Sequence, residues 1–255
     1  MRSGVDRCPG RGPTPRLGDV LRIVEELAGP GPLRICAHAP ADGAAGTGLR
    51  VLLIADVLAR VVEMRGRAVL IGWAGPHDKA AAAAAGIRPP DAEGDPQEIA
   101  EALGGLPGVQ LTTGTYEGAG SACLQIGEAQ LPPFEGLDLL AVRLLLLSHP
   151  YEEPVSVTAE QVGEAGRAMA RWRRAVADWA EQPSKPIPAD LKSTARTALD
   201  NRLDTAAVLR LLHDLATADD VPQGAKFETM AYLDRILGLE LVREVGISGG
   251  STPGT

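Results

Sequence analysis

The chain has few aromatic residues and few cysteines, and each shortage excludes a class of protein. Phe, Trp and Tyr together make up 3% of its 255 residues. The core must therefore be built mainly from Leu, Val, Ile and Ala. The three cysteines, Cys8, Cys36 and Cys123, have no spacing typical of a zinc site or of a disulfide framework. We expect no disulfide, and we expect Cys36 and Cys123 to be buried thiols within apolar strands.

Long apolar runs and an excess of positive charge are also missing. No segment approaches the run of about 18 apolar residues that indicates a transmembrane helix. The first residues are charged and rich in Pro and Gly, without the apolar stretch of a signal peptide. We therefore predict a cytoplasmic protein that does not contact a membrane. The formal net charge of −8 argues against a broad nucleic-acid surface, because phosphate backbones are held by clustered Lys and Arg.

One dense basic cluster is present, made of Arg171, Arg173 and Arg174. The same predicted helix carries Trp172 and Trp179. This pattern predicts an amphipathic helix with a solvated basic face and buried indole rings. Binding of tRNA through the cluster is the alternative, which the overall charge does not favour.

Apolar periodicity in the first half predicts a Rossmann-like α/β fold. Short apolar runs alternate with segments of helical spacing. Such alternation is typical of a parallel sheet with right-handed crossovers. The predicted strands span 33–37, 68–71, 109–112 and 122–126, and the predicted helices span 17–27, 49–64, 80–85 and 96–103.

From Leu137 onward the pattern changes to long helices, and we predict no strand after Leu147. Thr158 and Gln161 have the spacing of a capping box, and the prolines of segment 183–188 predict a break between two helices. The predicted helices span 137–147, 158–181, 191–215 and 225–237. The predicted domains are a disordered tail at 1–16, a nucleotide-binding-type domain at 17–136, a helical domain at 137–245 and a disordered tail at 246–255.

A glycine-rich segment, 43–48, lies between the first predicted strand and its helix. Backbone N–H groups at a helix N-terminus can bind phosphate, and the Thr47 hydroxyl would add a donor. A structural glycine turn is the alternative. His38 lies two residues beyond Cys36 and shares its strand face, but two ligands alone would make a weak metal site.

His77, Asp78 and Lys79 follow the second predicted strand. Ligands in α/β folds bind at the carboxyl ends of the strands, so a site role is one interpretation. Capping of the alanine-rich helix that follows is the other.

The segment that begins at Cys36 resembles the cysteinyl-tRNA synthetases and the related mycothiol cysteine ligases of class I. In those families a zinc-binding Cys ends the first strand, and an Asp follows six residues later. A His-Ile-Gly-His/Asn signature, an Arg and an Asp come next. Cys36, Asp42, Arg50 and Asp56 stand at the matching positions.

The signature itself differs. Ala45-Gly46-Thr47-Gly48 replaces it, with Ala45 and Gly48 at the two positions that carry imidazoles in the families. Only the short segment between Ile126 and Leu137 stands where the families carry the remaining zinc ligands and a Lys-Met-Ser-Lys-Ser loop.

Further patches similar to the families follow in the same order along the chain. Asp78 and Lys79 match the end of an Asp-rich loop. The start of the helical domain is matched by Asp200, Leu203, Asp204 and Thr205. The resemblance implies ATP or another adenine nucleotide as ligand, and it places Cys36 at a metal position. The implied cofactor-binding residues are Asp42, Gly46, Thr47, Gly48, Asp78 and Lys79.

Because the histidines and the lysine loop are replaced, we predict a paralogue without aminoacylation activity and assign no catalytic residue. We also predict no bound zinc, since a tetrahedral site needs three or four converging ligands. The predicted partner is a small molecule, a nucleotide or a protein, and a homo-oligomer is left open. One alternative is an active ATP-dependent ligase that forms cysteinyl-adenylate, with tRNA or an amino sugar as acceptor. The other is a structural subunit that binds a homologous synthetase.

Overall fold

The computed structural model describes residues 31–114 and 121–247. The predicted helix at 17–27, the predicted N-terminal tail and Cys8 lie outside these residues, as does most of the predicted C-terminal tail. Within the described ranges, no helix is long and apolar enough to cross a membrane.

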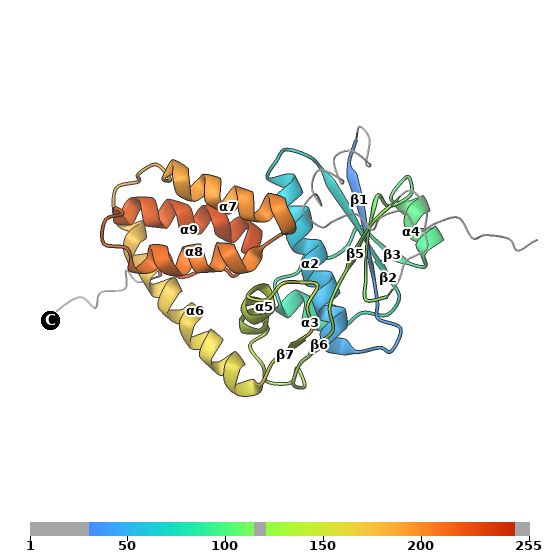
Figure 1. Cartoon of the computed structure of the whole chain (residues 1–255). Coiled ribbons are helices and arrows are strands. Elements are labelled where there is room, and N and C mark those ends of the chain that lie inside the picture. Colours follow the sequence, from blue (N-terminus) through green and yellow to red (C-terminus); the bar gives the residue numbers. More distant parts are fainter. Residues whose placement is uncertain (1–30, 115–120, 248–255) are drawn as a thin grey trace, which may run out of the picture.

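Five parallel strands form the central sheet in the order β3-β2-β1-β4-β5 (Figure 1). This order, with two strands on each side of β1, confirms the predicted Rossmann-like sheet. The unpredicted strand β3 contains only three residues, too few to show an apolar alternation. The strands are β1 Leu33–His38, β2 Val69–Ala74, β3 Ala92–Gly94, β4 Val109–Thr112 and β5 Ala122–Gln125.

Helices cover both faces of this sheet. The long helix α2, Ala45–Glu63, is buried along almost its whole length and packs on β1, β2 and β4. It begins four residues before the predicted start, because small residues continue the helix back to the loop after β1. Helix α4, Pro96–Ala102, packs on β2 and β3, and the short helix α3, Lys79–Ala84, follows β2.

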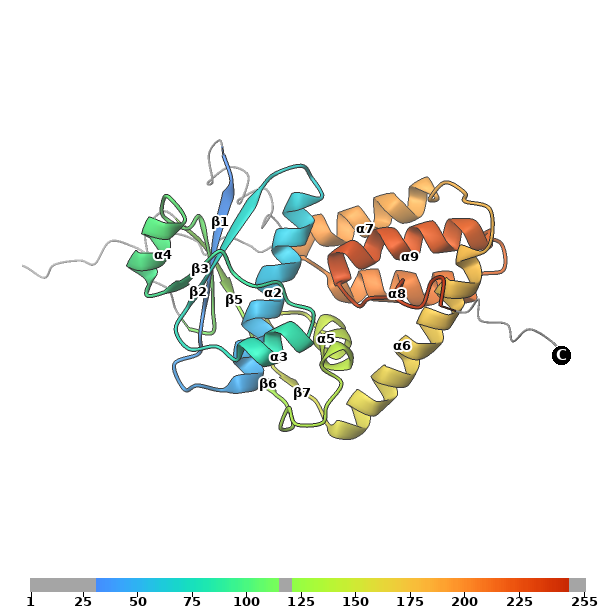
Figure 2. The ribbon, with the colours of Figure 1, turned by 180° about the vertical axis from the view of Figure 1, so that it is seen from behind.

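The helical region follows the sheet. Helices α7, α8 and α9 lie side by side near one end of α2, and α6 runs obliquely from α5 toward α9 (Figures 1 and 2). The predicted capping box of α6 is confirmed, because Thr158 and Gln161 each accept the hydrogen bond that the motif requires. The helices are α5 Leu139–Leu147, α6 Ala159–Ala180, α7 Ala189–Arg202, α8 Thr205–Thr217 and α9 Gln223–Leu237.

Two expectations for this region are wrong. The predicted helix at 191–215 is divided into α7 and α8, because Leu203 takes a left-handed conformation with φ of 54°. The side chain of Asp204 then caps α8 by accepting a bond from the backbone N–H of Ala207 at 2.8 Å. A two-residue strand, β7 Val155–Ser156, also occurs after Leu147 and pairs in parallel with β6 Ala129–Gln130.

Arg50 of α2 holds the segments around β6 and β7 together. Its fully buried guanidinium donates to the carbonyl oxygens of Gly127, Glu128, Pro150 and Glu153 at 2.5 to 3.3 Å. A Cβ at Gly127 would lie 2.4 Å from the Glu153 carbonyl, so only glycine allows this close approach. The short strand pair therefore depends on contacts that are distant in the sequence.

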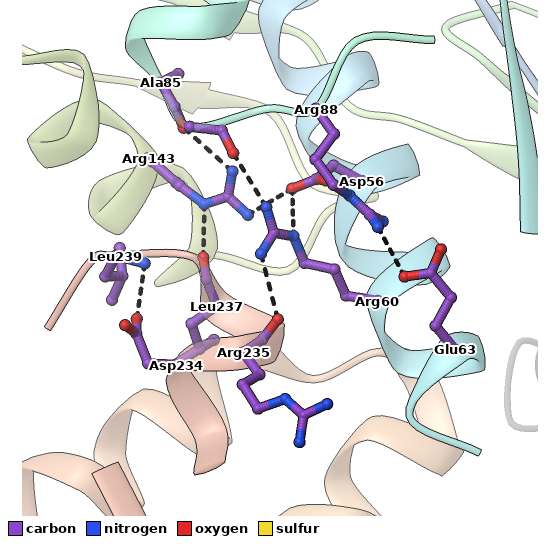
Figure 3. A network of polar contacts seen from close by, with 11 residues as sticks. Asp56, Arg60, Glu63, Ala85, Arg88, Arg143, Asp234, Arg235, Leu237 and Leu239 are labelled. Atoms are coloured by element: carbon purple, nitrogen blue, oxygen red, sulfur yellow. Dashed lines mark hydrogen bonds and ion pairs between the residues drawn. The ribbon is translucent and has the colours of Figure 1, made fainter. Parts of the chain in front are cut away.

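The carboxylate of Asp56, buried within α2, binds three arginines (Figure 3). Arg143 of α5 lies 2.7 Å from it, Arg60 of α2 lies 2.8 Å away, and Arg88 from the loop after α3 lies 3.0 Å away. Arg88 also pairs with Glu63 at 2.7 Å. One buried carboxylate therefore joins α2 to α5 and to the segment that leads to β3.

The same network holds the C-terminal end of α9. Arg143 donates to the carbonyl of Leu237 at 2.5 Å, and Asp234 accepts from the N–H groups of Leu239 and Leu241 at 2.8 Å. Arg173 of α6 donates to the carbonyl oxygens of Leu239 and Glu240, just beyond the end of α9. Cationic groups at a helix C-terminus are favourable because the helix dipole is negative there.

Arg173 is thus a correction to the predicted solvated basic face of α6. It is buried and donates to the Leu239 carbonyl at 2.7 Å, whereas Arg171 and Arg174 are exposed. Of the two indoles predicted to be buried, Trp179 is buried and Trp172 is only partly so. The buried apolar core continues from α2 into α5 and α9, and the division into two domains at residue 137 stays a prediction.

Burial alone would raise the pKa of the Asp56 carboxyl, but the charges of Arg143 and Arg60 outweigh it, with hydrogen bonds from Arg143 and Arg88. The net effect holds the pKa of Asp56 below its usual value. The ionised carboxylate therefore stabilises the folded state at pH values above the unfolded-state pKa of about 4. This stabilisation is lost as the pH falls through the pKa that Asp56 has in the folded state.

We expect Asp56→Asn to lower the free energy of unfolding by about 3 to 5 kcal/mol at pH 7, because it leaves Arg143 buried without a countercharge. The difference from the wild type should shrink as the pH falls below about 4, because Asp56 then binds a proton in the unfolded state and, at still lower pH, in the folded state. Urea denaturation followed by circular dichroism at both pH values measures the effect. Glu63→Gln is the control, since this exposed pair contributes less than about 1 kcal/mol. Equal losses in the two variants would contradict the central role of Asp56.

Candidate functional site

A cavity of about 240 Å³ lies beyond the C-terminal ends of β1 and β2. This is the sheet edge at which α/β folds bind ligands. Its walls come from the loop after β1, the start of α2 and the loop after β2, and they include Pro40, Gly43, Ala45, Gly48, His77 and Asp78. The cavity therefore joins the two segments in which the sequence predicted binding residues.

The N-terminus of α2 forms one wall of the cavity. Ala44, the N-cap residue, makes no side-chain hydrogen bond to the helix. The first N–H groups of a helix have no partner within the helix and carry the positive end of its dipole. Ala45 and Gly48 both line the cavity, so the two positions that correspond to the families' imidazoles face the same space.

Gly46 and Thr47 lie on a different side of α2. The Thr47 hydroxyl is buried, accepts from the Ala129 N–H at 3.0 Å and donates to the Ala129 carbonyl at 3.4 Å. A Cβ at Gly46 would lie 2.6 Å from the same carbonyl oxygen. These two residues attach α2 to β6, and a ligand role for their backbone N–H groups stays a prediction.

The predicted charged residues have local partners. Asp42 is exposed and accepts from the Ala44 N–H at 3.1 Å. Asp78 lines the cavity and also caps α3 by accepting from the Ala81 N–H at 2.9 Å, which is the capping role given as the alternative. Lys79 is exposed and forms an ion pair with Glu93 of β3.

His77 is the aromatic group in the cavity wall. Its ring packs edge-on against Trp73 with centroids 5.7 Å apart, and its buried Nε2 has no hydrogen-bond partner among the described residues. Burial lowers the pKa of His77, although hydrogen bonds to the backbone of Ala74 and Ala37 oppose this. A lowered pKa leaves the imidazole neutral at pH 7. The His77 side chain therefore supplies no positive charge to the cavity.

Cys36 and His38 are both in β1, two residues apart, so they lie on one face of the strand, as predicted. Cys36 is 1% exposed and belongs to a buried cluster with Ala74, Ile99 and Leu103, and burial raises the pKa of its thiol to about 11. His38 Nε2 lies 2.7 Å from Gln110 Oε1 on the neighbouring strand β4. No group of three His, Cys, Asp or Glu side chains able to hold a metal occurs among the described residues. Within residues 31–114 and 121–247, Cys36 therefore lacks the converging ligands that a zinc ion needs.

Cys123 departs from its predicted burial. It is exposed on β5, because β5 is an edge strand of which one face is buried and the other is open. Which face of an edge strand is exposed depends on the helices that pack on the sheet. The sequence of the strand alone therefore did not predict that Cys123 lies on the exposed face.

Arg50 and Asp56, which match the ligase pattern, do not line the cavity. Both are buried, and both bind groups that hold separate segments together. Sequence reasoning identified the loops that form the cavity, but it did not identify Pro40 or Leu52 as wall residues. Apolar and proline side chains carry no chemical signal of a binding site.

No family model matches the chain. Partial matches to curated proteins are found. An L-cysteine:1D-myo-inositol 2-amino-2-deoxy-alpha-D-glucopyranoside ligase of Beutenbergia cavernae is 37% identical over 113 residues, which are 42% of this chain and 25% of the relative. The ligase of the same name from Thermobispora bispora is 33% identical over 104 residues, 41% of this chain and 25% of the relative.

A cysteine–tRNA ligase of Rhodospirillum centenum is 35% identical over 78 residues, which are 31% of this chain and 16% of the relative. In these matches the chain spans a quarter or less of the length of each relative. The five-stranded parallel sheet agrees with the Rossmann-like domain that this similarity implies. The chain is therefore similar, over part of its length, to L-cysteine:1D-myo-inositol 2-amino-2-deoxy-alpha-D-glucopyranoside ligases and to cysteine–tRNA ligases.

Proposed function

We propose that this chain is a non-catalytic relative of the cysteine ligases that binds the phosphate-bearing part of an adenine nucleotide. The proposed site is the cavity beyond β1 and β2. The observation that carries the proposal is that Ala45 and Gly48, at the signature positions, both line this cavity. A cavity is present where the resemblance places the nucleotide. The two histidines that the resemblance implies at this cavity are replaced by Ala45 and Gly48.

Size and the position of the α2 N-terminus support a small anionic group as the ligand, and the one carboxylate in the wall, that of Asp78, accepts a hydrogen bond as the cap of α3. Binding sites for drug-sized molecules have volumes of roughly 300 to 1,000 Å³. The cavity of about 240 Å³ is smaller, so it suits a phosphate or an amino-acid-sized group, with the nucleoside outside it. The N-terminus of α2 offers N–H groups and the positive end of a helix dipole, which together favour an anion.

The loss of catalysis follows from the missing donors. Formation of an adenylate places negative charge on the α-phosphate in the transition state, and preorganised donors stabilise that charge. Removal of one such donor costs about 100- to 1,000-fold in rate. Ala45 and Gly48 supply no side-chain donor, and the neutral His77 supplies no positive charge. Binding through backbone N–H groups does not depend on these side chains.

We expect Ala45→Glu to weaken binding of ATP and AMP by about tenfold or more, because the new carboxylate would repel phosphate across the cavity. The fold should be retained, since an acidic residue in the first turn of a helix is favourable. Isothermal titration calorimetry with each nucleotide measures the change. Ala80→Glu is the matched control, because Ala80 is exposed on α3 and does not line the cavity. An absence of binding in the wild type, or an equal loss in both variants, would contradict the proposed site.

We expect cysteine-dependent exchange of pyrophosphate into ATP to be undetectable, because the α-phosphate donors are absent. The assay should include the Beutenbergia cavernae ligase as a positive control. Robust exchange that Ala45→Glu abolishes would overturn the proposal and establish an active ligase.

We expect the purified chain to carry less than about 0.1 zinc per molecule, because a structural zinc site requires converging ligands. The raised pKa of Cys36 keeps its thiol protonated at neutral pH, and a thiol must lose its proton to bind a metal. Inductively coupled plasma mass spectrometry of the protein purified without a metal-affinity tag measures the content. One zinc per chain that disappears in Cys36→Ala would contradict this prediction.

A further inference from the structure

A groove of about 1000 Å³ lies in the helical region, away from the nucleotide cavity. Helices α5, α6 and α8 form its walls. The ribbon views show α6 set at an angle to α8, so that the two helices separate toward the N-terminal end of α6 (Figures 1 and 2). Its floor is apolar and includes Leu144, Leu145, Ala165 and Leu209.

Arginines stand on both sides of this floor. Arg167 and Arg171 come from α6 and are one helical turn apart, and Arg210 comes from α8. All three are exposed, and none forms an ion pair or side-chain hydrogen bond with the rest of the described chain. Glu164 and Asp214 also line the groove, so the arginines exceed the carboxylates there in a chain with net charge −8.

Trp172 adds a second feature typical of a binding surface. Trp73 and Trp179 are buried, at 3% and 7% exposure, whereas Trp172 is partly exposed and lines the groove. Trp and Arg are the residues most enriched among those that dominate binding energy at protein interfaces. An indole beside unpaired guanidinium groups, over an apolar floor, is the composition of such an interface.

We propose that this groove binds an acidic amphipathic helix of a partner protein. The apolar face of the helix would cover Trp172 and the leucines of the floor, and its carboxylates would pair with Arg167, Arg171 and Arg210. Helices recognised in this way present apolar residues with i, i+3, i+4 and i+7 spacing. The apolar floor favours an amphipathic peptide over a nucleic acid, because a phosphate backbone has no apolar face to place on the leucines. The nucleotide cavity shares no residue with the groove, so this inference is independent of the proposed function.

The probe is a fluorescein-labelled synthetic helix with leucines at i, i+3, i+4 and i+7 spacing and glutamates at its other positions. Fluorescence anisotropy with the full chain measures its affinity. The same peptide with lysines in place of glutamates, and a labelled single-stranded RNA, are the comparisons. We expect the acidic peptide to bind about tenfold or more tightly than either, with affinity that falls as salt rises.

Variants test whether binding occurs in the groove. The double variant Arg167→Glu with Arg171→Glu, and separately Trp172→Ala, should each weaken binding by about tenfold or more. Arg174→Glu is the matched control, because Arg174 is exposed on the same helix but does not line the groove. Thermal melts establish that each variant is folded, and the exposed arginine variant remains informative if Trp172→Ala unfolds.

Four outcomes would overturn the proposal. These are an absence of binding by the acidic peptide, equal binding by the lysine peptide, tighter binding by RNA, and an equal loss in Arg174→Glu. Sedimentation of the chain alone gives a further test of the occupant. A dimer that Arg167→Glu with Arg171→Glu dissociates would assign the groove to a second copy of this chain instead.

Discussion

The negative charge of Asp56, placed in the interior of α2, is the constraint on which the arrangement of the molecule depends. A buried carboxylate is strongly unfavourable unless countercharges and hydrogen bonds surround it. Here the countercharges come from three separate places in the chain: Arg60 in α2, Arg88 beyond α3 and Arg143 in α5. Arg143 also binds the Leu237 carbonyl at the end of α9. Neutralising one charge therefore positions the helical region against the parallel sheet.

Buried arginines perform a related task elsewhere, because a guanidinium has several donors in one plane and can satisfy several carbonyls at once. Arg50 binds four carbonyls around β6 and β7, and Arg173 binds two beyond the end of α9. Arg50 and Asp56 are also among the residues that match the ligase pattern outside its signature. Residues that hold a fold together can be shared by relatives whose cavity side chains differ, which is the relation that we propose for this chain.

The two candidate surfaces differ in chemistry. The cavity beyond β1 and β2 is small, and its contribution to an anion would come from the α2 N-terminus rather than from a charged side chain. The groove between α5, α6 and α8 is larger, with Trp172 and unpaired arginines over an apolar floor. A small anionic ligand suits the first surface and an extended amphipathic partner suits the second. Arg173 is buried and does not line the groove, whereas Arg171 of the same helix does. The exposed positive charge of α6 is therefore smaller than its sequence suggested.

Local patterns in the sequence determined the elements whose apolar period is regular. They predicted β1, β4 and α6, the capping box at Thr158, and the loops that carry Ala45, Gly48 and Asp78 to one sheet edge. Contacts between distant segments decided the rest. The left-handed Leu203, the β6–β7 pair, the attachment of Thr47 to Ala129, the burial of Arg173 and the exposure of Cys123 follow no local period. Each of these features depends on which residues lie next to it after folding. A polar side chain can be buried at low free-energy cost only where the folded chain supplies a hydrogen-bond partner, and that partner comes from a distant segment.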